Sequence, residues 1–156
     1  NGILVGAGLS LVLFIWRTSD PHVAVLGKLP HSNFYRNVKR HDVQTWPEIA
    51  LVRIDASLYF ANTKLLEQTI ATTVNEQPKL KHLVLVGTAI NDVDFSALEA
   101  LEGIFQSLNA NDIQLHFAAF KGPVLDKLKG CGFTDHIGRN HIHLTTHDAM
   151  QQLGFV

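Results

Sequence analysis

The stretch Ile90-Asn91-Asp92-Val93-Asp94-Phe95-Ser96-Ala97-Leu98 decides how this chain is organised. The apolar run His82–Gly87 leads into it and is typical of a buried strand. Large apolar residues then recur with helical spacing, at Leu98, Leu101, Phe105 and Leu108. This pattern predicts a helix from Ser96 to about Leu108. A strand, a loop and a helix start thus follow one another, as they do where α/β domains place their functional residues.

Three polar side chains of this loop are candidate functional groups. Asp92, Asp94 and Ser96 lie where the first backbone N–H groups of a helix lack partners within the helix. Ser96 and Glu99 have the spacing of a capping box, which predicts a structural cap, with Asp94 complementing the helix dipole. The alternative is a regulatory phosphorylation or ligand site at Ser96, with Asp94 orienting a phosphate or cation. Asp92 is interpreted as a solvated loop acid.

The composition narrows the class of protein. The chain has 156 residues, enough for one domain with a sizeable core. Its net charge is −1 and it has no basic run, which argues against nucleic acid as a partner. The single cysteine, Cys131, excludes an internal disulfide and fits a reducing compartment. Because the first residue is Asn1 and not Met, we expect a fragment of a longer chain.

The first part of the chain is strongly apolar. Residues Ile3 to Trp16 carry no charge, and Trp16 is followed by Arg17, like an interfacial aromatic residue followed by a cytoplasmic cation. As a helix this segment extends about 21 Å, less than the roughly 30 Å of a bilayer's hydrocarbon core. We therefore expect residues 1–17 to be the tail of a transmembrane helix and residues 18–21 to be a linker. A secretory signal or a buried core helix is the alternative.

The rest of the chain alternates between strand-like and helix-like segments. We expect strands at residues 22–29, 49–54, 83–86, 113–118 and 142–144, and helices that begin near residues 62, 96, 122 and 145. Residues 30–47 are predicted as an extended excursion with room for a short edge strand, and residues 131–140 as a loop. The prediction is one α/β domain over residues 22–156, with a mostly parallel mixed sheet of about five strands and about four flanking helices.

Other kinds of site have little support in the sequence. The late histidines, His136, His141, His143 and His147, lack the cysteine pair or Glu-x-x-His motif of common metal sites. The loop after residue 87 has neither of the glycine-rich nucleotide motifs. No nucleophile with a partner base is evident. We therefore predict no metal, no cofactor and no enzymatic activity.

Four segments together resemble the cytoplasmic C-terminal part of sulfate permease (SulP-type) anion transporters. They are the apolar helix end that runs through Trp16-Arg17 into Pro21–Gly27, then Phe34–Val38, then Leu51–Asn62, and Asp94-Phe95-Ser96-Ala97. The last resembles the Asp-x-Ser-Gly motif of bacterial anti-sigma-factor antagonists, with Ala97 in place of glycine. The resemblance covers nearly the whole chain and implies a STAS fold, which the two groups of proteins share.

The resemblance also implies a function. SulP-type proteins move anions such as sulfate, bicarbonate or dicarboxylates and are commonly dimeric, and their transport site lies in a membrane domain that this chain lacks. We therefore expect a regulatory and assembly domain on the cytoplasmic side of the cell (inner) membrane, docked against the transmembrane domain of the same transporter and a second subunit. The antagonist serine that matches Ser96 is phosphorylated by a partner kinase, so a regulatory protein or a nucleotide at the Asp94–Ser96 loop is a further expectation. The alternative is a soluble, partner-switching anti-sigma-factor antagonist.

Overall fold

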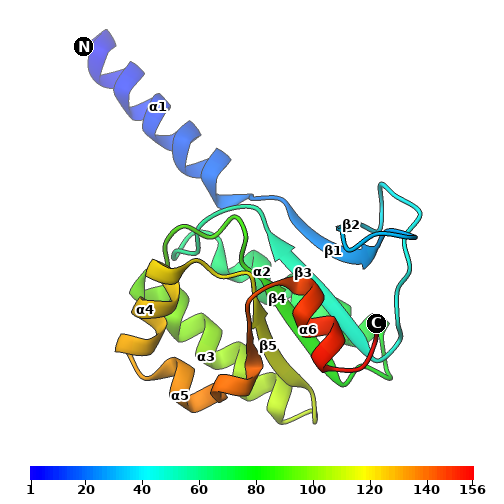
Figure 1. Ribbon diagram of the computed structural model, residues 1–156. Helices are drawn as coiled ribbons and strands as arrows, with labels where there is room; N and C mark the ends of the chain where they lie inside the picture. The colour runs from blue at the N-terminus through cyan, green and yellow to red at the C-terminus, as the bar shows by residue number, and fades with distance from the viewer.

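The computed structural model describes residues 1–156, which form one helix projecting from an α/β domain (Figure 1). The elements, in chain order, are α1 (Gly2–Ser19), β1 (Val23–Lys28), β2 (Tyr35–Asn37), β3 (Ile49–Ile54), α2 (Thr63–Glu76), β4 (His82–Val86), α3 (Phe95–Asn109), β5 (Gln114–Ala118), α4 (Gly122–Gly130), α5 (Phe133–Ile137), a 3-10 turn η1 (Arg139–His141), β6 (Ile142–His143) and α6 (Thr146–Gln152). The six strands form one sheet in the order β2-β1-β3-β4-β5-β6.

The strand directions place the loops that follow the parallel strands at one edge of the sheet. Strands β3, β4, β5 and β6 are parallel, so their carboxyl ends lie together at what we call the carboxyl edge of the sheet. Strand β1 runs antiparallel to β3, and its first residue, Val23, pairs with Ile54 at the end of β3. Helix α1 therefore enters the domain at the carboxyl edge, as Figure 1 shows.

Helices cover both faces of the sheet, but unequally. Helices α2 to α5 contribute to a cluster of 24 buried residues on one face, whereas α6 closes a cluster of 10 on the other. Because both faces are covered, β3 is buried at every position except Arg53, and β4 is buried at every position after His82. This double burial explains why these strands are continuous apolar runs without alternation.

The structure confirms the α/β prediction and adds elements to it. The sixth strand, β2, lies within the excursion 30–47, where the sequence left room for an edge strand. Helix α5 contradicts the loop predicted for residues 131–140. Gly132 and Gly138, with φ angles of 80° and 90°, lie directly before and after this short helix. Glycines in such conformations are typical of turns, so the segment resembles a loop in the sequence. Phe133 and Ile137 are one turn apart and bury its inner face.

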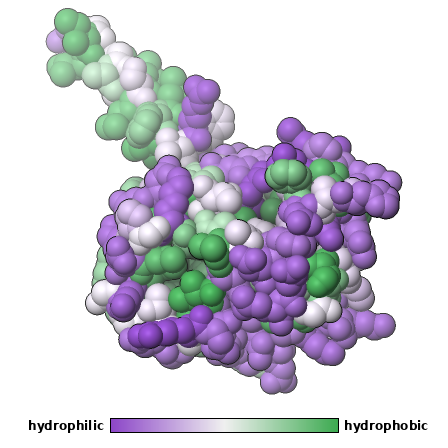
Figure 2. All heavy atoms as spheres, in the orientation of Figure 1, coloured by the Kyte–Doolittle hydropathy of each residue, from purple (hydrophilic) through white to green (hydrophobic).

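Helix α1 projects from the domain (Figure 1) and buries none of its side chains there. None of its residues is buried, and by length and composition it is the one helix of the chain that could cross a membrane. It continues to Ser19, two residues into the predicted linker, and its 18 residues rise about 27 Å. Figure 2 shows it as a largely apolar rod above a domain whose surface is mostly hydrophilic. Such a helix is stable only where something other than water covers its side chains.

The turn after β4 offers a test of the core packing. A Cβ at Gly87 would overlap the ring of Phe120, which is buried and packs edge to face on Phe117 at 4.9 Å. Gly87→Ala is therefore expected to lower the free energy of unfolding by about 1–3 kcal/mol. Gly103 lies inside α3 with open space around it, so Gly103→Ala is expected to raise that free energy by roughly 0.5–1 kcal/mol. Urea titrations that move both variants in the same direction would contradict this packing.

Candidate functional site

The predicted loop is part of a braced structure at the carboxyl edge. The backbone N–H of Leu58 donates to the carbonyl of Asp92 at 3.0 Å, and the N–H of Asp94 donates to the carbonyl of Leu58 at 3.1 Å. Leu58 and Val93, both almost fully buried, form an isolated parallel bridge. The loop before α3 is thus paired with the segment that follows β3, and its shape is fixed from both sides.

Asp94 is the residue that joins these two segments. Its Oδ1 accepts from the N–H of Ala97 at 2.8 Å, which makes Asp94 the N-cap of α3. Its Oδ2 accepts from the N–H of Phe60 at 3.1 Å. A carboxylate at this position is also favoured by the positive end of the helix dipole. Both oxygens therefore hold the start of α3 and the Phe60 turn together.

The capping box predicted for Ser96 and Glu99 is wrong. Helix α3 begins at Phe95, so Ser96 lies in its first turn, where it is exposed and its hydroxyl has no hydrogen-bond partner in the chain. Aspartate and serine are about equally good N-caps, so the local sequence offers two candidates. Asp94 takes the position because it also satisfies the Phe60 N–H, which is 34 residues away in the sequence.

Asp92 is more than a solvated acid. Its side chain is 71% exposed, but its Oδ1 lies 2.7 Å from the Nζ of Lys127. The hydrogen bond from Lys127 holds the pKa of Asp92 below its ordinary value, helped by the backbone N–H of Val93. An ion pair this exposed is a weak source of stability. It does tie the loop to α4.

Asn62 braces the turn between β3 and α2. It directly precedes α2, close to the predicted start of this helix, but its side chain makes no capping bond. Instead it is fully buried: its Nδ2 donates to the carbonyl of Ser57 at 2.7 Å, and its Oδ1 accepts from the N–H of Tyr59 at 3.1 Å. The Ser57 hydroxyl in turn accepts from the N–H groups of Asn91 and Asp92, both at 3.1 Å.

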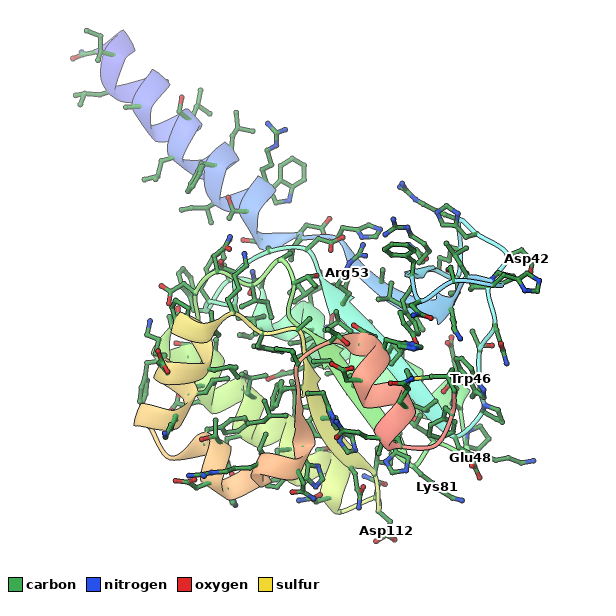
Figure 3. The ribbon with its side chains drawn as sticks, in the orientation of Figure 1. Asp42, Trp46, Glu48, Arg53, Lys81 and Asp112 are labelled. Carbon is green, nitrogen blue, oxygen red and sulfur yellow. The ribbon has the colours of Figure 1, made fainter.

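A polar junction, formed by Thr18, His22, Arg53, Asp55 and Tyr59, attaches α1 to this edge. The Tyr59 hydroxyl donates to the carbonyl of Thr18 at 2.7 Å. Asp55 accepts from the Nε of Arg53 at 2.6 Å, and its other oxygen lies 3.0 Å from the Nδ1 of His22. Burial raises the pKa of Asp55, but the hydrogen bonds from Arg53 and His22 outweigh it and leave that pKa below its ordinary value. Figure 3 shows Arg53 where α1 meets the sheet.

The late histidines are dispersed over several contacts. His136 lies 3.0 Å from Glu102, and His147 Nδ1 lies 3.0 Å from the hydroxyl of Tyr35. His141 and His143 lie against His116, a buried histidine that the sequence did not single out. No group of three or more His, Cys, Asp or Glu side chains has an arrangement that could hold a metal ion.

The two cap candidates can be separated by mutation. Asp94→Ala removes the cap and leaves the Phe60 N–H without its partner, so it is expected to lower the free energy of unfolding by about 1–2 kcal/mol. Ser96→Ala removes an exposed, unbonded hydroxyl and is expected to change it by less than about 0.5 kcal/mol. Urea denaturation of the two variants compares them directly. A larger loss in Ser96→Ala than in Asp94→Ala would refute the assignment of the cap.

Known proteins share both the sequence and the geometry of this domain. The STAS domain family model matches residues 40–149. Sulfate transporter 1.3 of Arabidopsis thaliana is 30% identical over 159 residues, which cover 96% of this chain and 24% of that protein. The chain thus spans about a quarter of the length of this relative.

The solved structures agree on the fold. The murine Slc26a9 anion transporter in its inward-facing state has a TM-score of 0.87 and 22% identity over 97% of this chain and 25% of its own. The anti-sigma factor antagonist SpoIIAA in its unphosphorylated form has a TM-score of 0.59 and 12% identity over 72% of this chain and 94% of its own. The family match covers more than half of the chain. The chain belongs to the STAS domain family.

Proposed function

We propose that this chain is the cytoplasmic regulatory and assembly domain of a SulP-type secondary anion transporter. In this proposal the parent protein lies in the cell (inner) membrane, and α1 is the end of its last transmembrane helix. The STAS domain follows on the cytoplasmic side of that membrane. Its partners are the transmembrane domain of the same transporter and a second subunit. The observation that carries the proposal is the polar junction, because it attaches an apolar, uncovered helix to the carboxyl edge of the sheet.

The ends of α1 and the sequence similarity support this orientation. Trp16 is 74% exposed near the domain end of the helix and is followed by Arg17, the pattern of a helix that leaves the bilayer on the cytoplasmic side. The similarity to Sulfate transporter 1.3 covers 96% of the chain, a span that takes in α1 as well as the domain.

The mechanism that we propose is conformational and not catalytic. The Tyr59–Thr18 hydrogen bond and the His22–Asp55 contact act on both sides of the short connection between α1 and β1. A rotation of the STAS domain therefore turns the end of α1 with it, and a movement of α1 displaces the domain. Coupling of this kind biases transport through the relative stability of two arrangements, without any chemical step in the domain.

The carboxyl edge also presents an apolar contact surface. Phe60 and Phe95 are 69% and 73% exposed, and the two residues are linked through Asp94. Both stand at the edge from which α1 leaves, so we propose that they contact the transmembrane domain or the second subunit. The free hydroxyl of Ser96 follows Phe95 directly. A phosphate there would place about two negative charges beside this apolar surface and would weaken such a contact.

A soluble anti-sigma-factor antagonist remains the alternative function. SpoIIAA shows that the fold serves such proteins, and Asp94-Phe95-Ser96-Ala97 resembles their motif. The alternative leaves α1 without a role, since the helix would expose its apolar side chains to water. The transporter domain accounts for α1 and for the junction together.

The two tyrosines of the chain provide a matched test in the parent transporter. Tyr59→Phe removes the hydrogen bond to Thr18, whereas Tyr35→Phe removes one to His147, on the α6 side of the domain. Because one such bond contributes about 0.5–1.5 kcal/mol, Tyr59→Phe is expected to change anion uptake by about 2- to 10-fold and Tyr35→Phe to leave it unchanged. Labelled sulfate uptake in cells, normalised to transporter abundance, measures both. Equal uptake in both variants and the wild type, or a parent chain found in the soluble fraction, would count against the transporter domain.

Phosphorylation of Ser96 has its own test. Intact mass and peptide mapping of the parent protein, purified from its native cells, are expected to show phosphate on Ser96 in part of the molecules. Ser96→Asp is expected to reduce co-purification of the STAS domain with a separately expressed transmembrane domain, with Ser107→Asp, on the exposed part of α3, as the control. No phosphate on Ser96 under any growth condition would remove the regulatory role of this serine but would leave the transporter proposal standing.

A further inference from the structure

Three histidines form a hydrogen-bonded chain across the sheet, on the face that α6 covers. His82 Nδ1 on β4 lies 3.2 Å from His116 Nε2 on β5, and His116 Nδ1 lies 3.2 Å from His143 Nε2 on β6. The chain ends on α6, where the Oε1 of Gln152 lies 3.0 Å from His143 Nδ1. We call His82, His116 and His143 the histidine chain. It links three strands to the last helix.

Each bond of the histidine chain needs one donor and one acceptor. The carbonyl oxygen of Gln152 accepts, so His143 donates through Nδ1 and accepts through Nε2. His116 then donates through Nδ1 to His143 and accepts through Nε2 from His82. A second proton on His116 or His143 would turn an acceptor nitrogen toward a facing N–H. A second proton would force the neighbouring rings to change tautomer and would place a positive charge in this buried cluster.

The surroundings of the chain contain no carboxylate that would stabilise a charged His116. His116 is 2% exposed, and the ring of His141 stacks on it at 4.5 Å while donating to the carbonyl of Leu115. Burial, together with a smaller effect of the neighbouring histidines, lowers the pKa of His116 to about 3. Burial also lowers the pKa values of His82 and His143. The other titratable groups near the cluster are Lys81 and Glu48 beside His82, Asp148 near His143, and the His147–Tyr35 pair.

Histidine contacts hold helix α6 at both of its ends, one made by its own His147 and the other by His143 of the histidine chain. Near its start His147 contacts the hydroxyl of Tyr35 at 3.0 Å, and at its last residue Gln152 contacts His143. Beyond the helix, Gly154 with φ of 80° turns the chain so that the ring of Phe155 packs edge to face against His82 at 6.0 Å. The apolar anchor is small: within the seven-residue helix only Ala149 and Met150 are buried.

We propose that the histidine chain is a proton-operated latch, which holds α6 and the tail 153–156 on the sheet while its rings are neutral and releases them when they are protonated. Release uncovers the sheet face formed by Val84, Val86 and Ala118, which α6 closes in the latched state. This inference does not depend on the proposed transporter function, because it rests on contacts within the domain alone.

The direction of the pH dependence follows from the lowered pKa values. In the latched state burial holds the pKa of His116 at about 3 and the pKa values of His82 and His143 below the ordinary 6.5. When α6 lifts away, water reaches the rings and their pKa values return toward 6.5. Release therefore takes up protons: the latch holds fully above pH 6.5 and weakens as the pH falls below it. At pH 5.5 His116 alone raises the ratio of released to latched molecules about tenfold, and His82 and His143 shift it in the same direction.

Hydrogen exchange of the 156-residue chain in lipid nanodiscs tests the latch. After correction for the intrinsic exchange rate, the amides of α6 and Phe155 are expected to exchange about tenfold faster or more at pH 5.5 than at pH 7.5, while those of α3 keep their protection. His116→Gln is expected to remove most of this pH response, and His41→Gln, at an exposed loop histidine, to leave it intact. His82→Asn, at the half-buried end of the chain, gives the same test if His116→Gln does not fold.

Two outcomes would overturn the latch. One is protection of α6 that is equal at the two pH values in the wild type. The other is loss of protection in α3 and α6 together, because the histidines would then set only the stability of the whole domain. A pH response in His116→Gln as large as in the wild type would assign the effect to other groups and would equally refute the proposal.

Discussion

The carboxylate of Asp94 joins two parts of the chain that are 34 residues apart, and the carboxyl edge of the sheet depends on it. One oxygen starts α3 and the other holds the Phe60 turn, so the helix on one side and the segment after β3 on the other share a single anchor. Tyr59, the residue before Phe60, then reaches the end of α1. The attachment of the outer helix to the core thus passes through one turn and one side chain.

Within the segment Asp94–Ala97, one side chain is structural and another is available for modification. The side chain of Asp94 has a structural role, since both of its carboxylate oxygens accept hydrogen bonds from backbone N–H groups. Ser96, two residues later, has an exposed hydroxyl without a partner. An exposed hydroxyl therefore stands beside a loop that is hydrogen-bonded on both sides, and the neighbouring Phe60 and Phe95 leave an apolar surface next to it. The loop is well suited to present a change of charge to a partner without altering the domain itself.

Local patterns in the sequence predict the sheet and its main helices but not the contacts between distant segments. The apolar runs at β3 and β4 are long and buried on both faces, so periodicity and turn residues suffice to place them. The cap of α3 was misassigned because the second bond of Asp94 comes from Phe60, which no local rule reveals. Arg53, Asp55 and His116 were missed for the same reason, and α5 because two glycines surround it. The family was identified from the resemblance to SulP-type proteins, which rests on segments such as Phe34–Val38 and Leu51–Asn62 and not on periodicity.

The direction of β1 has a consequence for the opposite end of the molecule. Because β1 runs antiparallel to β3, α1 enters at the carboxyl edge, whereas the chain ends near the start of β4, where Phe155 packs against Trp46 and His82. Figure 3 places Trp46, Glu48 and Lys81 at that end of the sheet and Arg53 at the other. The last residue, Val156, is thus separated from α1 by about one strand length, roughly 17–20 Å. A fluorescent protein or affinity tag fused after Val156 would therefore stand clear of α1 and of the junction that holds it.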